Sequence, residues 1–275
     1  MKRDKIAIVG GGNMGLAFAK ALIKAKRVDP KHLLIVDRSI SRKLHLKNEL
    51  KCQVLGCPDK TLSQYDVVIL AVKPQDAGAL LGQLAPFIKR TQFVISMMTG
   101  IKLKDLSRAF NNHARIVRSM PNLPAHVRKG VTVWKPLKKL SPKDRQLTLE
   151  ILSSAGETLE VSKESLLDAA TAVPATGPGY FFYLLEYMIK ASQALGFSKK
   201  ESQFLIRETM RGSLAIWEET DLSPEELRAR VTSKGGTTKA AVTEFTKHKL
   251  GQTIVRGIKA ADRRARELSK LTIKP

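Results

Sequence analysis

The stretch Lys5–Gly15, KIAIVGGGNMG, joins a short apolar run to three spaced glycines. Its first half predicts a buried strand, and residues 13–26 have the periodicity of an amphipathic helix. Gly10, Gly12 and Gly15 form a G-x-G-x-x-G pattern at the junction of the two elements. Because the pattern follows a strand and opens a helix, it predicts a helix start that binds the pyrophosphate of a dinucleotide.

The residues after the second predicted strand bear on which dinucleotide is bound. Asp37 lies about 20 residues beyond the glycine motif, where an acidic residue binds the ribose 2′-hydroxyl of NAD. Arg38, Ser39, Arg42 and Lys43 follow it, and these residue types suit the 2′-phosphate of NADP instead. Ser39 also suits a helix N-cap. These residues alone leave the cofactor preference open.

The pattern of apolar runs divides the chain in two. In the first half, apolar runs alternate with helical patterns, which is typical of a parallel sheet covered on both faces. We therefore predict a doubly wound parallel Rossmann sheet over residues 1–162 and an all-α domain over residues 163–275. The predicted strands are 5–9, 32–37, 66–72, 91–97, 114–120 and 156–162. The predicted helices of the second half are 165–172, 180–195, 198–219, 224–231, 237–248 and 252–270.

A second glycine-rich stretch, VTSKGGTTKAAVTEF at Val231–Phe245, also has the composition of an anion-binding helix start. Glycines let the main chain approach a ligand closely, and the helix dipole favours negative charge. A helix that is simply capped by threonine after a glycine turn has the same composition. The residues alone do not choose between these two interpretations.

The composition restricts the class of protein. The net charge of +23 over 275 residues is large, but lysine and arginine are spread along the whole chain. We therefore do not expect nucleic-acid binding as the main function. Two cysteines, Cys52 and Cys57, suggest reduced thiols in the cytoplasm, and no metal site is expected. The uncharged stretch 169–185 is broken by prolines and glycines, so no membrane span is expected.

Four further motifs follow the glycine loop in order: LAVKPQD at 70–76, RSMPNLPAHVRKGVT at 118–132, TGPGYFFYLLE at 176–186 and SKGGTTKAAV at 233–242. Together with the glycine loop they resemble the pyrroline-5-carboxylate reductase family over essentially the whole chain. The resemblance implies reduction of 1-pyrroline-5-carboxylate to L-proline, the final step of proline biosynthesis. It also implies NADP(H) with a slight preference over NAD(H), and a homodimer with interlocked helical domains, often assembled into decamers.

The resemblance also implies roles for individual residues. It places the pyrophosphate at the glycine loop, the nicotinamide near Asn122, and the substrate carboxylate at the second glycine loop. Thr238 would hydrogen-bond the ring nitrogen of the substrate as an orienting donor and is the expected catalytic residue. The expected cofactor residues are Gly10, Gly12, Asn13, Met14, Asp37, Arg38, Ser39, Ala71, Val72, Lys73, Pro74 and Asn122. The expected substrate residues are Gly177, Pro178, Ser233, Gly235, Gly236, Thr237 and Thr238.

Two alternative functions belong to other classes. One is a reductase of another cyclic imine or of a small acid, because Lys234 stands where the family usually has proline. The other is a basic nucleic-acid-binding protein that retains a Rossmann domain. Side-by-side rates with each candidate substrate would identify the first class, and salt-sensitive nucleic-acid binding without turnover would identify the second.

Overall fold

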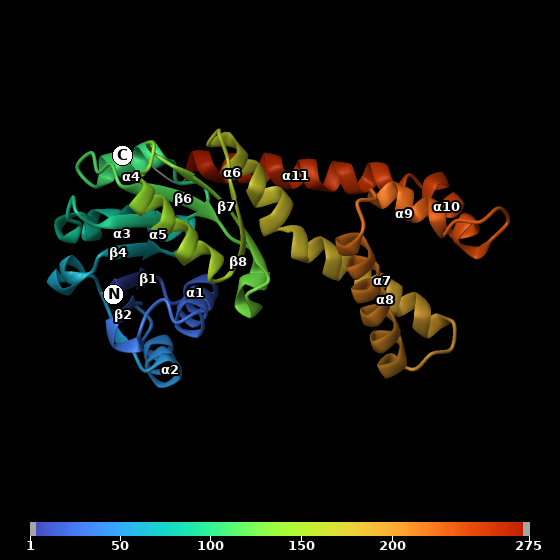
Figure 1. Cartoon of the computed structure of the whole chain (residues 1–275), viewed down its shortest axis with the longest axis horizontal. Helices are drawn as coiled ribbons and strands as arrows, with labels where there is room; N and C mark the ends of the chain where they lie inside the picture. The colour runs from blue at the N-terminus through green and yellow to red at the C-terminus, as the bar shows by residue number, and fades with distance from the viewer. Residues whose placement is uncertain (1–3, 272–275) are drawn as a thin grey trace. The chain divides into compact units, whose positions relative to one another are not determined.

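A computed structural model describes residues 4–271 of the chain (Figure 1). These residues form two compact units. The first contains the chain up to Pro178 together with the segment that begins at Ala261, and the second spans Gly179–Ala260. The domain boundary predicted after residue 162 stays a prediction. Within residues 4–271, no helix has the length and apolar character needed to cross a bilayer.

The first unit is built on one eight-stranded sheet in the order β3-β2-β1-β4-β5-β6-β7-β8. All neighbouring strands are parallel except β6 and β7, which are antiparallel. The strands are β1 (Ile6–Val9), β2 (Leu33–Val36), β3 (Gln53–Leu55), β4 (Val67–Leu70), β5 (Phe93–Ser96), β6 (Ile116–Met120), β7 (Gly130–Pro136) and β8 (Gly156–Glu160).

Helices cover both faces of this sheet (Figure 1). Side chains on one face of β1 pack in a core cluster with α1, α2 and α5, and those on the other face pack with α3 and α4. Because each central strand is buried on both sides, its sequence is continuously apolar, as predicted. The helices are α1 (Asn13–Lys24), α2 (Ile40–Leu50), α3 (Pro74–Leu84), α4 (Leu103–Ala109), α5 (Pro142–Ser153) and α6 (Ser165–Ala170). Short helical turns are η1 (Pro30–His32), η2 (Lys60–Gln64), η3 (Ala85–Phe87), η4 (Leu123–Val127) and the π-helix η5 (Thr171–Ala175).

The predicted fold class is confirmed, but two strands were not predicted. The strand β3 has only three residues and lies at the sheet edge, where its side chains are partly exposed. The strand β7 follows β6 after a single short turn, η4. A crossover to a parallel neighbour needs a dozen or more residues, so this short connection produces the antiparallel pair.

The second unit consists of helices, as predicted. Its elements are α7 (Gly177–Ala194), α8 (Lys199–Glu219), α9 (Pro224–Arg230), α10 (Thr237–Lys247) and α11 (Leu250–Leu271), of which α7 and α11 begin or end in the first unit. Ser198 and Ser223 each form a capping box with a glutamate three residues later. Gly196 ends α7 with a φ of +105°, so the predicted stop is confirmed.

The helical unit buries almost none of its apolar side chains within one chain. Of the described residues 179–260, only Ser192 and Ser202 are buried. An apolar surface of this extent requires cover from another protein surface. Its exposed large apolar side chains include Phe181, Phe182, Tyr183, Tyr187, Met188, Leu195, Phe197, Phe204, Met210, Leu214, Ile216, Trp217, Phe245, Ile254 and Val255.

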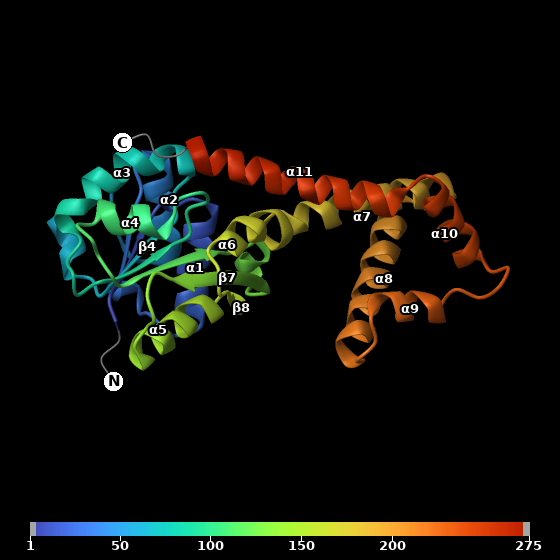
Figure 2. The same ribbon diagram turned by 90° about the horizontal axis from the view of Figure 1, so that it is seen from above.

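The C-terminal end of α11 belongs to the first unit, where it packs against the loop after β5 (Figure 2). A Cβ added to Gly100 would lie 2.9 Å from the Cα of Ser269, so this contact depends on a glycine in the loop after β5. Ala265, one turn earlier on α11, is buried. The chain therefore leaves the first unit at α7 and returns to it at the end of α11.

A buried ionic cluster holds α6 against the sheet. The guanidinium of Arg118, on β6, is fully buried and donates to Glu164 at 3.0 Å and to Asp168 at 2.6 Å. The same Glu164 oxygen accepts a hydrogen bond from the backbone N–H of Leu103, the first residue of α4. One arginine thus joins the sheet to α4 and α6.

We expect Asp168→Asn to destabilise the protein by about 2–4 kcal/mol, because it leaves a buried guanidinium with one charged partner. The urea midpoint, followed by circular dichroism at fixed protein concentration, measures the loss. Glu157→Gln, at an exposed position of β8, is the control and should cost less than about 0.5 kcal/mol. Equal midpoints for the two variants would contradict the role given to the cluster.

Candidate functional site

The glycine loop brings α1 directly onto the end of β1. Gly10 has a φ of +103°, and a Cβ there would lie 2.5 Å from the carbonyl oxygen of Ala71. A Cβ on Gly15 would overlap the carbonyl oxygen of Gly10. The first glycine therefore makes the turn and the last permits the close helix–sheet contact, as the motif predicts.

The start of α1 is open toward solvent and carries free donors. Gly12 is the N-cap and supplies no side-chain cap, so the first-turn N–H groups lack the usual side-chain acceptor. A Cβ on Gly12 would meet no atom within 4 Å. Asn13 and Met14 form the first turn behind it. Space, unpaired N–H groups and the positive end of the helix dipole together fit a pyrophosphate.

Asp37 braces this loop from the neighbouring strand. One carboxylate oxygen accepts a hydrogen bond from the N–H of Gly11 at 2.8 Å, and the other accepts one from the N–H of Ser39 at 2.9 Å. Arg42 donates from Nε to the carbonyl oxygen of Gly11 at 2.7 Å. Ser39 is the N-cap of α2, where its hydroxyl accepts from the N–H of Arg42. Asp37 and Arg42, two of the residues predicted near the ribose or its 2′-phosphate, therefore also hold the glycine loop in place.

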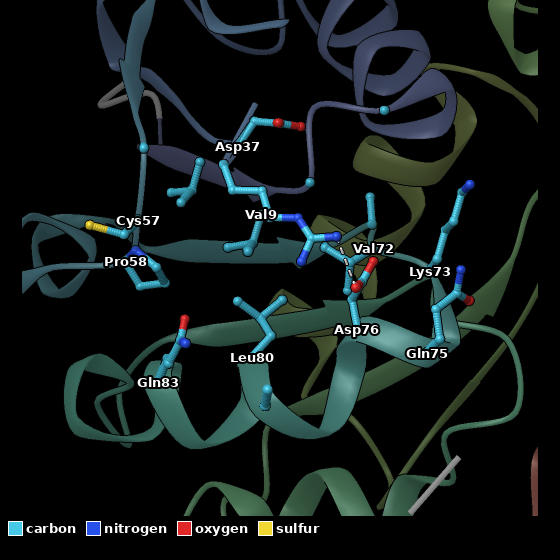
Figure 3. A pocket seen from close by; sticks show the side chains of 17 residues that line it. Val9, Asp37, Cys57, Pro58, Val72, Lys73, Gln75, Asp76, Leu80 and Gln83 are labelled. Carbon is cyan, nitrogen blue, oxygen red and sulfur yellow. Dashed lines mark hydrogen bonds and ion pairs between the residues drawn. The ribbon is translucent and has the colours of Figure 1, made fainter. Parts of the chain in front are cut away.

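A cavity of about 620 Å³ lies along the carboxyl ends of β1, β2 and β4. Figure 3 shows Cys57 and Pro58 at one end of it, and Lys73 and Gln75 at the other. This is the crevice in which open parallel sheets bind ligands. The lining residues are Val9, Gly10, Gly12, Val36, Asp37, Arg38, Gly56, Cys57, Pro58, Ala71, Val72, Lys73, Gln75, Asp76, Ala79, Leu80 and Gln83.

The structure brings most of the predicted cofactor residues together in this cavity. Asn13, Met14, Ser39 and Pro74 are not among the lining residues but lie within two residues of one in the chain. Those that line it are Gly10, Gly12, Asp37, Arg38, Ala71, Val72 and Lys73.

The side chain of Asn122, which was predicted to lie near the nicotinamide, is hydrogen-bonded within the fold. It follows β6, is buried, and accepts a hydrogen bond at its side-chain oxygen from the N–H of Val131 at 2.9 Å. It is not among the residues that line the cavity. Its role at the nicotinamide therefore stays a prediction.

Several lining residues were missed in the sequence. Gly56, Cys57 and Pro58 follow β3, so the missing strand hid them. Asp76 and Leu80 lie on α3, within and beyond the LAVKPQD motif, and helical spacing of three and seven residues from Lys73 could have placed them on the cavity side. Cys57 is exposed in this cavity, whereas Cys52 is buried, and burial raises the pKa of its thiol to about 11.

The second glycine loop, in the helical unit, also forms an uncapped helix start. Gly235 has a φ of +73°, and Gly236 is the N-cap of α10 without a side-chain cap. The N–H of Gly236 donates to the carbonyl oxygen of Ser233 at 3.1 Å. Thr237 and Thr238 open the helix, the first exposed and the second half-buried. Five of the predicted substrate residues thus share one turn, while Gly177 and Pro178 begin α7 in the first unit.

Comparisons with known proteins agree with this geometry. The family described as pyrroline-5-carboxylate reductase dimerisation matches residues 164–268, and the family described as coenzyme F420-dependent NADP oxidoreductase matches residues 5–100. The match to a dimerisation family, together with the exposed apolar surface, means that the helical unit forms oligomers.

Relatives match along the full length. Pyrroline-5-carboxylate reductases from Pseudomonas aeruginosa and Synechocystis are 31% and 32% identical, covering 98% and 97% of this chain and 98% of each relative. A Plasmodium falciparum pyrroline carboxylate reductase structure with NADP bound has a TM-score of 0.89 at 26% identity, covering 98% of this chain and 99% of that one. The reductase from Coxiella burnetii has a TM-score of 0.85 at 29% identity, covering 97% and 99%. These matches do not favour a nucleic-acid-binding protein.

We expect Gly12→Ser to weaken dinucleotide binding by about tenfold or more while leaving the fold intact. The serine hydroxyl would cap α1 and occupy the N–H groups that the phosphate needs, and such charge-assisted hydrogen bonds are individually strong. The same cap should raise the stability by a few tenths of a kcal/mol. Fluorescence titration and thermal melts measure the two effects. Gly82→Ser, at an exposed glycine of α3, should change neither by much, and equal binding by both variants would contradict the phosphate site.

Proposed function

The chain belongs to the pyrroline-5-carboxylate reductase family, and we propose that it reduces 1-pyrroline-5-carboxylate to L-proline with a nicotinamide dinucleotide as hydride donor. The observation that carries this proposal is the full-length similarity to reductases of that name, at 31–32% identity. The cavity at the glycine loop supports it, because the same residues fit a dinucleotide.

In this proposal the first unit holds the cofactor. The first turn of α1, with Gly12, Asn13 and Met14, binds the pyrophosphate through backbone N–H groups. Asp37 and Arg38 lie where the adenosine ribose would be bound, and Lys73 lies toward the nicotinamide end. The bound dinucleotide supplies the hydride, while the protein orients the two reactants.

The second glycine loop holds the substrate. The N–H groups and hydroxyls at Ser233, Gly236 and Thr237 bind the substrate carboxylate, helped by the dipole of α10. The Thr238 hydroxyl hydrogen-bonds the ring nitrogen and orients the C=N bond toward the hydride donor. Because a threonine hydroxyl is a poor acid, Thr238 does not protonate this nitrogen itself. Either water supplies the proton in the site, or the imine binds already protonated. Gly177 and Pro178, at the start of α7, are further proposed substrate contacts.

The oligomer and the location are finer parts of the proposal. Two chains interlock through their helical units, which covers the exposed apolar side chains of α7 and α8, and such dimers assemble further into decamers. NADP(H) is slightly preferred, which the NADP in the Plasmodium falciparum structure supports. The two free cysteines are consistent with a cytoplasmic enzyme.

The proposal is tested by mixing the purified protein with 1-pyrroline-5-carboxylate and following nicotinamide absorbance with NADPH and with NADH. Oxidation of either dinucleotide, with L-proline as product, is the expected result. A smaller or larger cyclic imine, run beside it, measures substrate preference. Folded protein that binds a dinucleotide but oxidises none of it with this substrate would refute the proposal.

We expect Thr238→Val to lower kcat about 10- to 100-fold, the effect of losing one hydrogen bond to a charged group. Dinucleotide affinity should stay unchanged, because the threonine acts only on the substrate. Thr238→Ser, which keeps the hydroxyl, should retain most of the activity. Thr243→Val is the matched control on α10, since the Thr243 hydroxyl bonds only the helix carbonyl of Lys239. A kcat for Thr238→Val equal to that of the control would remove Thr238 from the mechanism.

A further inference from the structure

An ion pair joins two walls of the dinucleotide cavity. The Arg38 guanidinium donates to the Asp76 carboxylate at 3.1 Å, marked by the dashed line at Asp76 in Figure 3. Arg38 follows β2, and Asp76 lies in the first turn of α3, just after β4. Because β2 and β4 flank β1 on opposite sides, the pair spans the end of β1, where the glycine loop begins. A dinucleotide that enters this cavity therefore meets both side chains.

The pair is exposed and easily rearranged. The Arg38 side chain is 83% exposed and the Asp76 side chain 35% exposed. Exposed pairs of this kind are weak. When a phosphate reaches Arg38, the guanidinium gains a bidentate partner that binds it more strongly than one carboxylate oxygen does. The arginine can thus exchange one anion for the other.

Asp37, the residue expected to choose between the cofactors, is already engaged. Both of its oxygens accept backbone N–H groups, from Gly11 and Ser39. It is fixed as part of the loop, and its charge is present whichever dinucleotide binds. Among the residues that line the cavity, Arg38 and its partner Asp76 are therefore placed to respond to a 2′-phosphate.

Building on the function proposed above, we propose that Asp76 is a specificity-determining residue that competes with the 2′-phosphate of NADPH for Arg38. In the free protein the Asp76 carboxylate holds the guanidinium across the cavity. When NADPH binds, Arg38 transfers to the phosphate and the carboxylate is left beside an added negative charge. NADH brings no such phosphate, so its binding does not depend on this exchange. Asp76 thus weakens NADPH binding relative to NADH binding, and so reduces the preference for NADPH that Arg38 alone would produce.

A purely structural role for Asp76 makes a different prediction, and the chain contains a matched control. Asp76 is the third residue of α3, where an acidic side chain stabilises the helix start. Asp105 is the third residue of α4, also pairs with an arginine, Arg108, and has a 32% exposed side chain. Both helices even have a lysine as N-cap. Asp76→Asn and Asp105→Asn therefore each remove one favourable interaction between a carboxylate and a helix start. Only Asp76→Asn also changes the charge of the cavity, so a purely structural role predicts the same result for both variants.

The experiment titrates NADPH and NADH into the wild-type chain and both variants, and follows nicotinamide fluorescence without substrate. Asp76→Asn should tighten NADPH binding about two- to fivefold, the range that an exposed ion pair contributes, and leave NADH binding unchanged. The gain should shrink as the salt concentration rises. Asp105→Asn should change neither affinity.

Repeating the titrations in an Arg38→Ala background separates the transfer of Arg38 to the phosphate from simple repulsion between Asp76 and the phosphate. With the arginine absent, Asp76→Asn should lose most of its effect on NADPH, because no cation remains to be released. Equal changes for NADPH and NADH, or the same gain in Asp105→Asn, would overturn the inference while leaving the proposed function intact. If the wild-type chain binds neither dinucleotide, the proposed function and this inference are both wrong.

Discussion

The contact between Gly15 and the carbonyl oxygen of Gly10 sets the position of α1 on the sheet, and the rest of the cofactor site depends on it. With α1 so close to β1, its unpaired N–H groups lie at the edge where β2 and β4 also end. Asp37 then fixes the loop by two hydrogen bonds from the adjacent strand. Glycines expose the backbone on part of the cavity wall, and apolar and charged side chains line the rest.

The sequence predicted the fold well where local and tertiary requirements coincide. The central strands are apolar throughout because helices cover both faces, and the serine caps at Ser198 and Ser223 are local signals that need no tertiary context. The strands β3 and β7 were not predicted. One is a three-residue edge strand without a strong local pattern, and the antiparallel pairing of the other is set by the short connection from β6.

The candidate site was predictable in its residues but less so in their roles. The glycine motif identified the cavity, yet the sequence could not show that Asp37 holds the loop, because its partner Gly11 is 26 residues away. The same holds for Arg38 and Asp76, which are 38 residues apart and meet only because β2 and β4 flank β1. The nicotinamide contact of Asn122 and the substrate contacts of the second glycine loop remain predictions.

The scarcity of buried side chains in residues 179–260 has a kinetic consequence. Since most of the apolar surface of these helices is covered only when chains meet, their folding and their association are one event. That event is second order in chain concentration, whereas the Rossmann sheet, with a core of its own, can form in a single chain. A newly made chain would therefore pass through a state with a folded nucleotide-binding unit and unpaired helices, and the time spent there would lengthen as the protein became dilute.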